Sequence, residues 1–158
     1  GFGRSDQAGL LPGTDAPEFA VQTLSGDSLS LRGLQGRPVV LEFFSPQNSL
    51  YGRQLATRNA LYDATRSDSV AFVSVSVEPD TLLFRAFTDA RTMPGHRVIV
   101  PEGIESPVAT AYNVARLPAR FLIGPDGRIV GRYQGTAFLG MQEDLLQLLE
   151  GTRTADPG

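Results

Sequence analysis

Polar side chains that could act on a ligand follow two apolar runs of the chain. Gln47, Asn48 and Ser49 come directly after the run at 39–44, with Leu50 and Tyr51 next, and Glu78 ends the run at 70–77. Amide and phenol groups donate and accept hydrogen bonds, and a carboxylate can also move protons. One hypothesis is therefore an enzyme that uses Asn48, Tyr51 or Glu78 on a small molecule.

Several other chemistries are excluded by residues that the chain lacks. It has no cysteine, which rules out disulfides, cysteine-ligated zinc, iron–sulfur clusters and thiol nucleophiles. His96 is the single histidine, so no site with two imidazoles can form, and we expect it to lie solvated in a loop. Ser45, Ser49 and Ser106 have no evident base partner. We therefore predict no catalytic residue of these classes, no metal and no cofactor.

Hydrophobic periodicity and turn residues predict alternating strands and helices. The predicted elements are a β-hairpin at 18–31, a strand at 39–44, a helix at 49–66, a strand at 70–77, a helix at 79–91, a strand at 97–100, a helix at 106–112, a β-hairpin of 120–123 with 128–133, and a helix at 137–150. Asn48 or Ser49 suits the N-cap of the helix at 49–66, and Gly151 suits the C-cap of the last helix.

This order predicts an α/β fold with a central mixed sheet of about five strands flanked by helices, preceded by an N-terminal β-hairpin. The strands at 39–44 and 70–77 are expected to be adjacent and parallel because one helix joins them. Residues 13–151 form one predicted domain. Residues 1–12 are expected to be a flexible arm, and residues 152–158 a flexible tail.

Composition narrows the classes of partner. The 158 residues carry a net charge of −3, and nothing indicates the basic face that nucleic-acid binding needs. No apolar run reaches the roughly 18 residues of a membrane span. The chain starts with Gly1 and shows no signal peptide, so the sequence itself leaves the compartment open.

Motifs at both ends of the chain resemble a known family. The opening stretch is GTDAPEF at 13–19, followed by VLEFFSPQNSLY at 40–51 and ALY at 60–62; the closing stretch is YNV at 112–114, LP at 117–118, FLI at 121–123 and DGRIV at 126–130. Together, at this separation, they resemble the thioredoxin-like redoxin family of TlpA and ResA type, within the AhpC/TSA-redoxin superfamily. The resemblance covers roughly residues 13–150 and implies a thioredoxin-like fold.

The chain departs from this family where the family's two cysteines fall. Aligned without gaps, the first cysteine becomes Asn48 and the second becomes Tyr51. The first cysteine of such proteins is a nucleophile because a helix N-terminus stabilises its thiolate. An asparagine amide cannot replace that thiolate, and a tyrosine cannot resolve a mixed disulfide. Thiol–disulfide exchange and thiol peroxidase activity are therefore excluded.

The resemblance also implies roles for other residues. Pro118 matches the family's cis-proline, and the backbone at Leu117 would keep a capacity to pair with an extended partner. Glu78 matches an acidic position near the cysteines, although a role at the start of the following helix is the simpler interpretation. Asn48 as a plain helix cap, and Tyr51 packed on the sheet with its hydroxyl in water, are the matching simple interpretations. Family members are commonly extracytoplasmic or periplasmic.

The leading hypothesis is a redox-inactive, non-catalytic module that binds a protein or peptide. Its binding residues would be Gln47, Asn48, Ser49, Leu50, Tyr51, Glu78, Leu117 and Pro118. The enzyme of a non-thiol class stays the alternative. Replacement of the cysteines by design is a third possibility, for which Asn and Tyr would be unusual choices.

Overall fold

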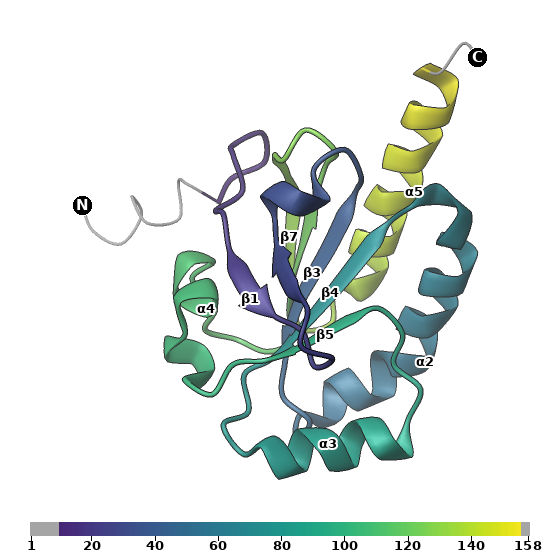
Figure 1. Ribbon diagram of the computed structural model, residues 1–158. Coiled ribbons are helices and arrows are strands. Elements are labelled where there is room, and N and C mark those ends of the chain that lie inside the picture. The colour runs from purple at the N-terminus through teal and green to yellow at the C-terminus, as the bar shows by residue number, and fades with distance from the viewer. Residues whose placement is uncertain (1–9, 156–158) are drawn as a thin grey trace.

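A five-stranded mixed sheet with the strand order β5-β4-β3-β6-β7 organises the chain in the computed structural model, which describes residues 10–155 (Figure 1). A separate antiparallel pair, β1 and β2, forms the N-terminal hairpin. The strands are β1 Ala20–Gln22, β2 Ser28–Ser30, β3 Val39–Phe44, β4 Ala71–Ser76, β5 His96–Ile99, β6 Ala119–Ile123 and β7 Ile129–Gln134; the α-helices are α2 Ser49–Ala64, α3 Thr81–Ala90, α4 Pro107–Ala111 and α5 Phe138–Ala155. Short 3-10 turns cover Arg32–Leu34, Arg66–Asp68 and Gly103–Glu105.

The two central strands are apolar because both of their faces are covered. Every residue of β3 and β4 is buried, and the strands run parallel from Val39 opposite Ala71 to Phe44 opposite Ser76. Helix α2 is the crossover that joins them. The predicted α/β architecture, including the adjacent parallel strands and the N-terminal hairpin, is confirmed.

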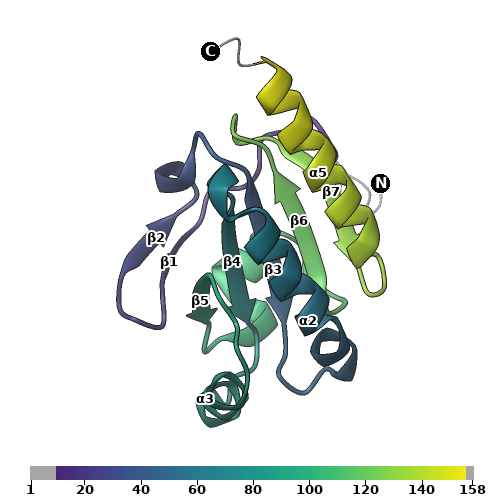
Figure 2. The same cartoon turned by 90° about the vertical axis from the view of Figure 1, so that its right-hand side faces the viewer.

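Different elements cover the two faces of the sheet (Figure 2). On one face, the hairpin and α4 contribute Phe19, Val108 and Tyr112 to a large apolar core around β3 and β4. On the other face, α5 packs against β3 and β6 through Met141 and Leu145, while α2 and α3 share a smaller aromatic cluster beneath Phe44. The charged residues described below lie on this second face.

Several predicted boundaries need correction. Helix α5 runs through Gly151 to Ala155, so Gly151 is an interior residue and not a C-cap, and residues 152–155 of the predicted tail are helical. A glycine inside a helix costs about 1 kcal/mol relative to Ala. Leu10, in the predicted arm, is buried in the core, and the Gly13 N–H donates to the Ile129 carbonyl. Residues 1–9 and 156–158 lie outside the described residues.

Candidate functional site

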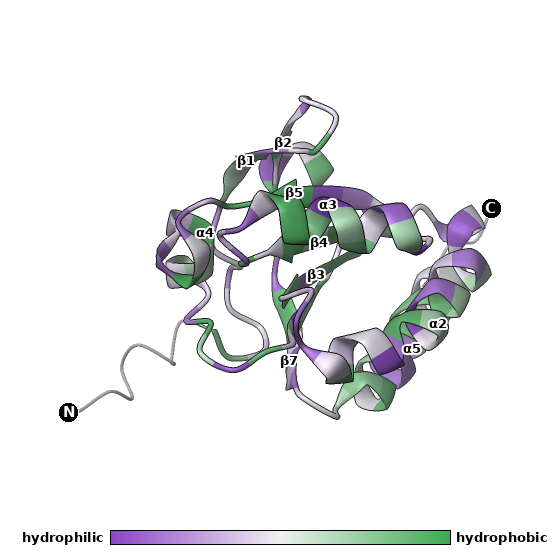
Figure 3. Cartoon of the chain, turned by 90° about the horizontal axis from the view of Figure 1, so that it is seen from below, coloured by the Kyte–Doolittle hydropathy of each residue, from purple (hydrophilic) through white to green (hydrophobic). Residues whose placement is uncertain are grey.

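The end of the molecule where β3 passes into α2 brings most of the predicted site residues together. We call it the α2 pole and define it as residues 47–51, Glu78, Leu117 and Pro118. Figure 3 views this end of the molecule. The Leu117–Pro118 bond is cis, as predicted, and it precedes β6, which pairs with β3. Pairing of β3 with both β4 and β6 therefore carries three separate segments to one end of the sheet.

Asn48 joins two of these segments. It is the N-cap of α2, and its Oδ1 accepts a hydrogen bond from the Tyr51 backbone N–H at 2.9 Å. Its Nδ2 donates to the Leu117 carbonyl at 3.3 Å. The predicted capping role is confirmed. The same side chain also bridges the helix to the residue before the cis-proline.

Gln47 and Glu78 form a second link across the α2 pole. The exposed Gln47 side chain donates from Nε2 to Glu78 Oε1 at 2.7 Å. The other carboxylate oxygen of Glu78 accepts the Asp80 backbone N–H at 3.0 Å, and Asp80 is the N-cap of α3. The Glu78 carboxylate thus serves the start of a helix, in line with the simpler interpretation, and it also holds Gln47.

Tyr51 lies inside the protein. Its side chain is fully buried and stacks on Phe44 with 4.3 Å between ring centroids. Its hydroxyl donates to Glu42 Oε2 at 2.9 Å, so the expectation that this hydroxyl is in water is wrong. The cause is helical geometry, because the third residue after the cap points toward the sheet. There the buried Glu42 carboxylate accepts its hydrogen bond. Tyr51 therefore cannot present its ring to a partner.

Below the α2 pole lies a buried charge cluster, which we define as Glu42, Arg58, Arg120, Ser74 and Tyr51. Glu42 accepts hydrogen bonds from Arg58 Nε at 2.8 Å and Arg120 Nε at 2.9 Å, one on each oxygen. Ser74 adds a third bond at 2.6 Å. Two guanidinium groups and one carboxylate leave one net positive charge in the interior.

The neighbours of the two arginines complete their surroundings. Arg58 also donates to Asn59 and Ser74 and lies over the Phe72 ring at 5.1 Å. Arg120 donates to Gln54 and lies 4.7 Å from the Phe138 ring centroid, while its Nη2 is buried without a hydrogen-bond partner in the part of the chain that the structure describes. Aromatic faces stabilise these cations where no second carboxylate is available.

This environment decides the protonation of the cluster. Burial by itself raises the pKa of Glu42, but the Arg58 and Arg120 charges, with hydrogen bonds from Ser74 and Tyr51, lower it to about 2. Burial and the nearby Glu42 charge raise the pKa of Tyr51 well above its usual value. Glu42 is therefore ionised and Tyr51 neutral at any physiological pH. Neither group is poised to exchange protons with a substrate.

What remains open at the α2 pole is backbone and apolar surface. The Leu117 N–H donates to no acceptor within residues 10–155, and the first N–H groups of a helix have no helical partner, which leaves those of Ser49 and Leu50. Leu50 and Leu117 are half-buried, and Ser49 is exposed. Pro118 is buried and contributes no surface.

One residue outside the α2 pole, His96, differs from expectation. His96 begins β5 and is half-buried, so it does not lie in a solvated loop; burial, then the Arg37 charge, lowers the pKa of its imidazole. Ser106 is buried as the N-cap of α4. Among residues 10–155, no group of three or more His, Asp or Glu side chains is arranged to hold a metal ion. No helix in this range has the length and apolar character to cross a membrane.

The buried charge cluster was not predicted from the sequence. Its signal was present: Glu42 interrupts the apolar run predicted to form the strand at 39–44, and an ion buried there must be paired. Arg58 lies on the inward face of α2 at three residues from Leu55 and Leu61, a position normally apolar. A buried carboxylate at Glu42 needs cationic partners, and Arg58 and Arg120 are charged residues at core positions that supply them.

Comparison with known proteins fits this geometry. The family model of the AhpC/TSA family matches residues 12–132. The chain belongs to the AhpC/TSA family. Thiol-disulfide oxidoreductase ResA from Bacillus subtilis is 28% identical over 145 residues, which cover 90% of this chain and 78% of that protein.

Solved structures of proteins from other organisms show the same fold. A thiol:disulfide interchange protein of DsbE type from Chlorobium tepidum superposes with a TM-score of 0.81 at 20% identity, covering 89% of this chain and 99% of its own. A secreted disulfide oxidoreductase from Mycobacterium tuberculosis gives 0.69 at 22% identity, covering 84% and 95%. The ResA relative and these two structures carry the names of thiol-disulfide proteins, whereas this chain has no cysteine and cannot carry out thiol–disulfide exchange.

Proposed function

We propose that this AhpC/TSA domain binds a protein or peptide partner without thiol chemistry, through the exposed part of the α2 pole. The observation that carries the proposal is the Asn48 bridge to Leu117. The family's nucleophile position holds a residue that ties the helix start to the cis-proline segment at 3.3 Å, and so keeps the α2 pole ordered without a reactive group. A rigid surface with unpaired backbone donors suits recognition.

The contact surface we propose consists of Gln47, Ser49, Leu50 and Leu117. Leu50 and Leu117 supply apolar area, while Gln47 and the free N–H of Leu117 supply polar contacts. Helix α3 lies at the same end of the molecule (Figure 3), and its exposed residues Leu82 and Leu83 add apolar area. Apolar residues bordered by polar groups are typical of interaction sites.

The enzyme alternative has less support. The polar side chains at the α2 pole already have partners within it: Asn48 donates to the Leu117 backbone carbonyl, and Gln47 donates to the Glu78 carboxylate. A groove beside the N-terminal hairpin and a smaller pocket near Asp15 are both lined by residues outside the α2 pole. An enzyme site usually combines an enclosed pocket with convergent polar groups.

The test is recovery of partners from the source organism with the immobilised chain, followed by affinity measurement with variants. Leu50→Asp and Leu117→Asp place a charge on the proposed surface and are expected to weaken binding by about thirtyfold or more, the size of a hot-spot loss of about 2 kcal/mol. Tyr51 is unsuitable for this purpose because its replacement would open the core.

Leu146→Asp is the matched control, because Leu146 is exposed on α5 and outside the α2 pole. Circular dichroism must show that all three variants keep the fold. If neither pole variant changes the affinity by more than about twofold, the α2 pole is not the binding surface. We also propose an extracytoplasmic location, supported by the secreted Mycobacterium tuberculosis relative; fractionation of source cells with an antibody to the chain checks it.

A further inference from the structure

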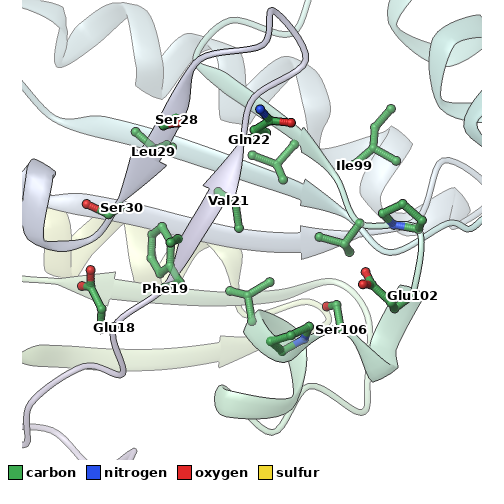
Figure 4. A pocket seen from close by; sticks show the side chains of 16 residues that line it. Glu18, Phe19, Val21, Gln22, Ser28, Leu29, Ser30, Ile99, Glu102 and Ser106 are labelled. Carbon is green, nitrogen blue, oxygen red and sulfur yellow. The ribbon is translucent and has the colours of Figure 1, made fainter.

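A groove of about 820 Å³ opens on the side of the molecule, between the N-terminal hairpin, the end of β5 and α4 (Figure 4). The hairpin meets β5 just after β1 ends. The Leu24 N–H donates to the Arg97 carbonyl at 2.7 Å, and Thr23 forms an isolated antiparallel bridge with Val98. Beyond this point the hairpin and the segment around β5 diverge and leave room between them.

The floor of the groove is apolar. Phe19 from the start of the hairpin, Val100 after β5 and Val108 of α4 line it, and all three are buried. They belong to the main core of the protein, so the floor is rigid. A volume of this size lies in the range of pockets that hold an organic ligand or a few peptide residues.

One wall of the groove is an unused strand edge. Strand β1 pairs with β2 through its odd-numbered residues, since the Leu31 N–H donates to the Phe19 carbonyl and the Thr23 N–H to the Asp27 carbonyl. In an antiparallel pair the residues between them direct their backbone groups to the opposite edge. The N–H and C=O of Ala20 therefore point away from β2 and toward the groove.

The charge of the groove has one sign. Glu18 and Glu102 are its only charged lining residues in the part of the chain described, and both are exposed. Figure 4 shows them at opposite ends of the groove, with Phe19 and Ser106 between. A chain lying along the groove would meet a carboxylate at each end.

We propose that this groove binds an extended, basic peptide segment of a partner protein as an added strand beside β1. The backbone of the segment pairs with Ala20, alternate apolar side chains rest on Val100 and Val108, and basic side chains meet Glu18 and Glu102. Strand addition supplies affinity through main-chain bonds and selectivity through alternate side chains. The proposal is independent of the α2 pole and holds whether or not that surface binds a partner.

The test is an NMR titration of the full ¹⁵N-labelled chain with a blocked pentapeptide of sequence Lys-Val-Thr-Val-Lys. Binding is expected to shift the amide signals of Ala20, Val21 and Val100. A peptide with both Lys replaced by Glu should bind about tenfold more weakly or worse, and so should one with Pro for the central Thr, which lacks the N–H. Raised salt should weaken the first peptide's binding.

Two variants separate the groove from other acidic surface. The double variant Glu18→Gln, Glu102→Gln should bind the basic peptide about fivefold more weakly or worse, and Glu105→Gln, an exposed neighbour outside the groove, should bind it within about twofold of the unaltered chain. The proposal is overturned if all three peptides bind alike, if shifts fall on the α2 pole and not the groove, or if about 1 mM basic peptide shifts no groove signal. The proposed function would survive each of these outcomes.

Discussion

Asn48 and Leu117 lie 69 residues apart in the chain and are joined by a single side-chain hydrogen bond, from Nδ2 to the backbone carbonyl, at 3.3 Å. Asn48 also caps α2 through its other amide atom. One residue thus performs two tasks at the position where the family's relatives would hold a cysteine. The link occupies one lone pair of the Leu117 carbonyl, and the Leu117 N–H donates to no acceptor within residues 10–155.

Substitution of Asn48 should separate these two tasks. Asn48→Ala removes both the cap and the bridge and is expected to lower the free energy of unfolding by about 1–2 kcal/mol. Asn48→Ser keeps a good capping oxygen but has no group that reaches Leu117, so it should cost less. Urea unfolding followed by circular dichroism measures both. Equal losses for the two variants would mean that the cap contributes nothing.

The hydroxyl of Tyr51 should contribute through Glu42 alone. Tyr51→Phe keeps the stack on Phe44 but removes a hydrogen bond to a buried carboxylate, and we expect a loss of about 1.5–3 kcal/mol in the free energy of unfolding. Tyr62→Phe is the matched control, because the half-buried Tyr62 hydroxyl donates to no group within residues 10–155. If both variants lose the same amount, the Tyr51–Glu42 bond is not the cause.

Acid should unfold the domain partly through Glu42. The pKa of Glu42 is about 2 in the folded chain against an ordinary 4.5. The contribution of ionised Glu42 to the free energy of unfolding is therefore present above about pH 4.5 and is lost as the pH falls toward 2. This difference corresponds to about 3 kcal/mol. The measurement is urea unfolding at a series of pH values between about 6 and 2.5.

Because other carboxylates titrate in the same range, variants must identify the Glu42 contribution. Ser74→Ala removes one hydrogen bond to this carboxylate and should make the loss of stability with falling pH smaller. Glu42→Gln leaves two buried arginines without a counter-charge and should cost about 3–5 kcal/mol at neutral pH. An unchanged pH dependence in Ser74→Ala would argue that Glu42 does not govern the acid transition.

The chain should have no thiol–disulfide activity at any pH. It contains no cysteine, and Met93 and Met141 are thioethers that form no disulfide. Reduction of insulin by dithiothreitol should run at the rate of the protein-free control. Turnover above this control in a preparation free of thioredoxin would overturn the prediction.

Periodicity predicted most of the fold, because β3, β4 and α3 carry patterns that only one backbone period satisfies. Asn48 as a helix cap followed from residue type alone. The end of α5 did not follow, since Gly151 stops a helix only if the following residues leave the helical path, which side-chain type does not decide. Likewise, His96 belongs to β5 because pairing with Val73 extends the strand past the loop.

The site was predicted in part only. Proximity of Gln47, Glu78 and Leu117 rests on the order of strands in the sheet, which the resemblance supplied. The inward direction of Tyr51 depends on where α2 begins and on Glu42 opposite it, a long-range pairing that local patterns do not encode. A second pocket, of about 310 Å³ near Asp15 and Gly127, was not predicted from the sequence, because residues at turns line it.

The inner face of α2 has a consequence for how the domain opens. A helix that packs through leucines alone exposes adhesive apolar surface when it detaches, but the inward stripe of α2 includes Arg58 and the polar end of Tyr51 beside Leu55 and Leu61. Detachment would hydrate a carboxylate and two guanidiniums, groups that water accepts readily. Amide exchange in α2 should therefore report an opening with a high free-energy cost. The opened state should aggregate little, although no disulfide holds the helix in place.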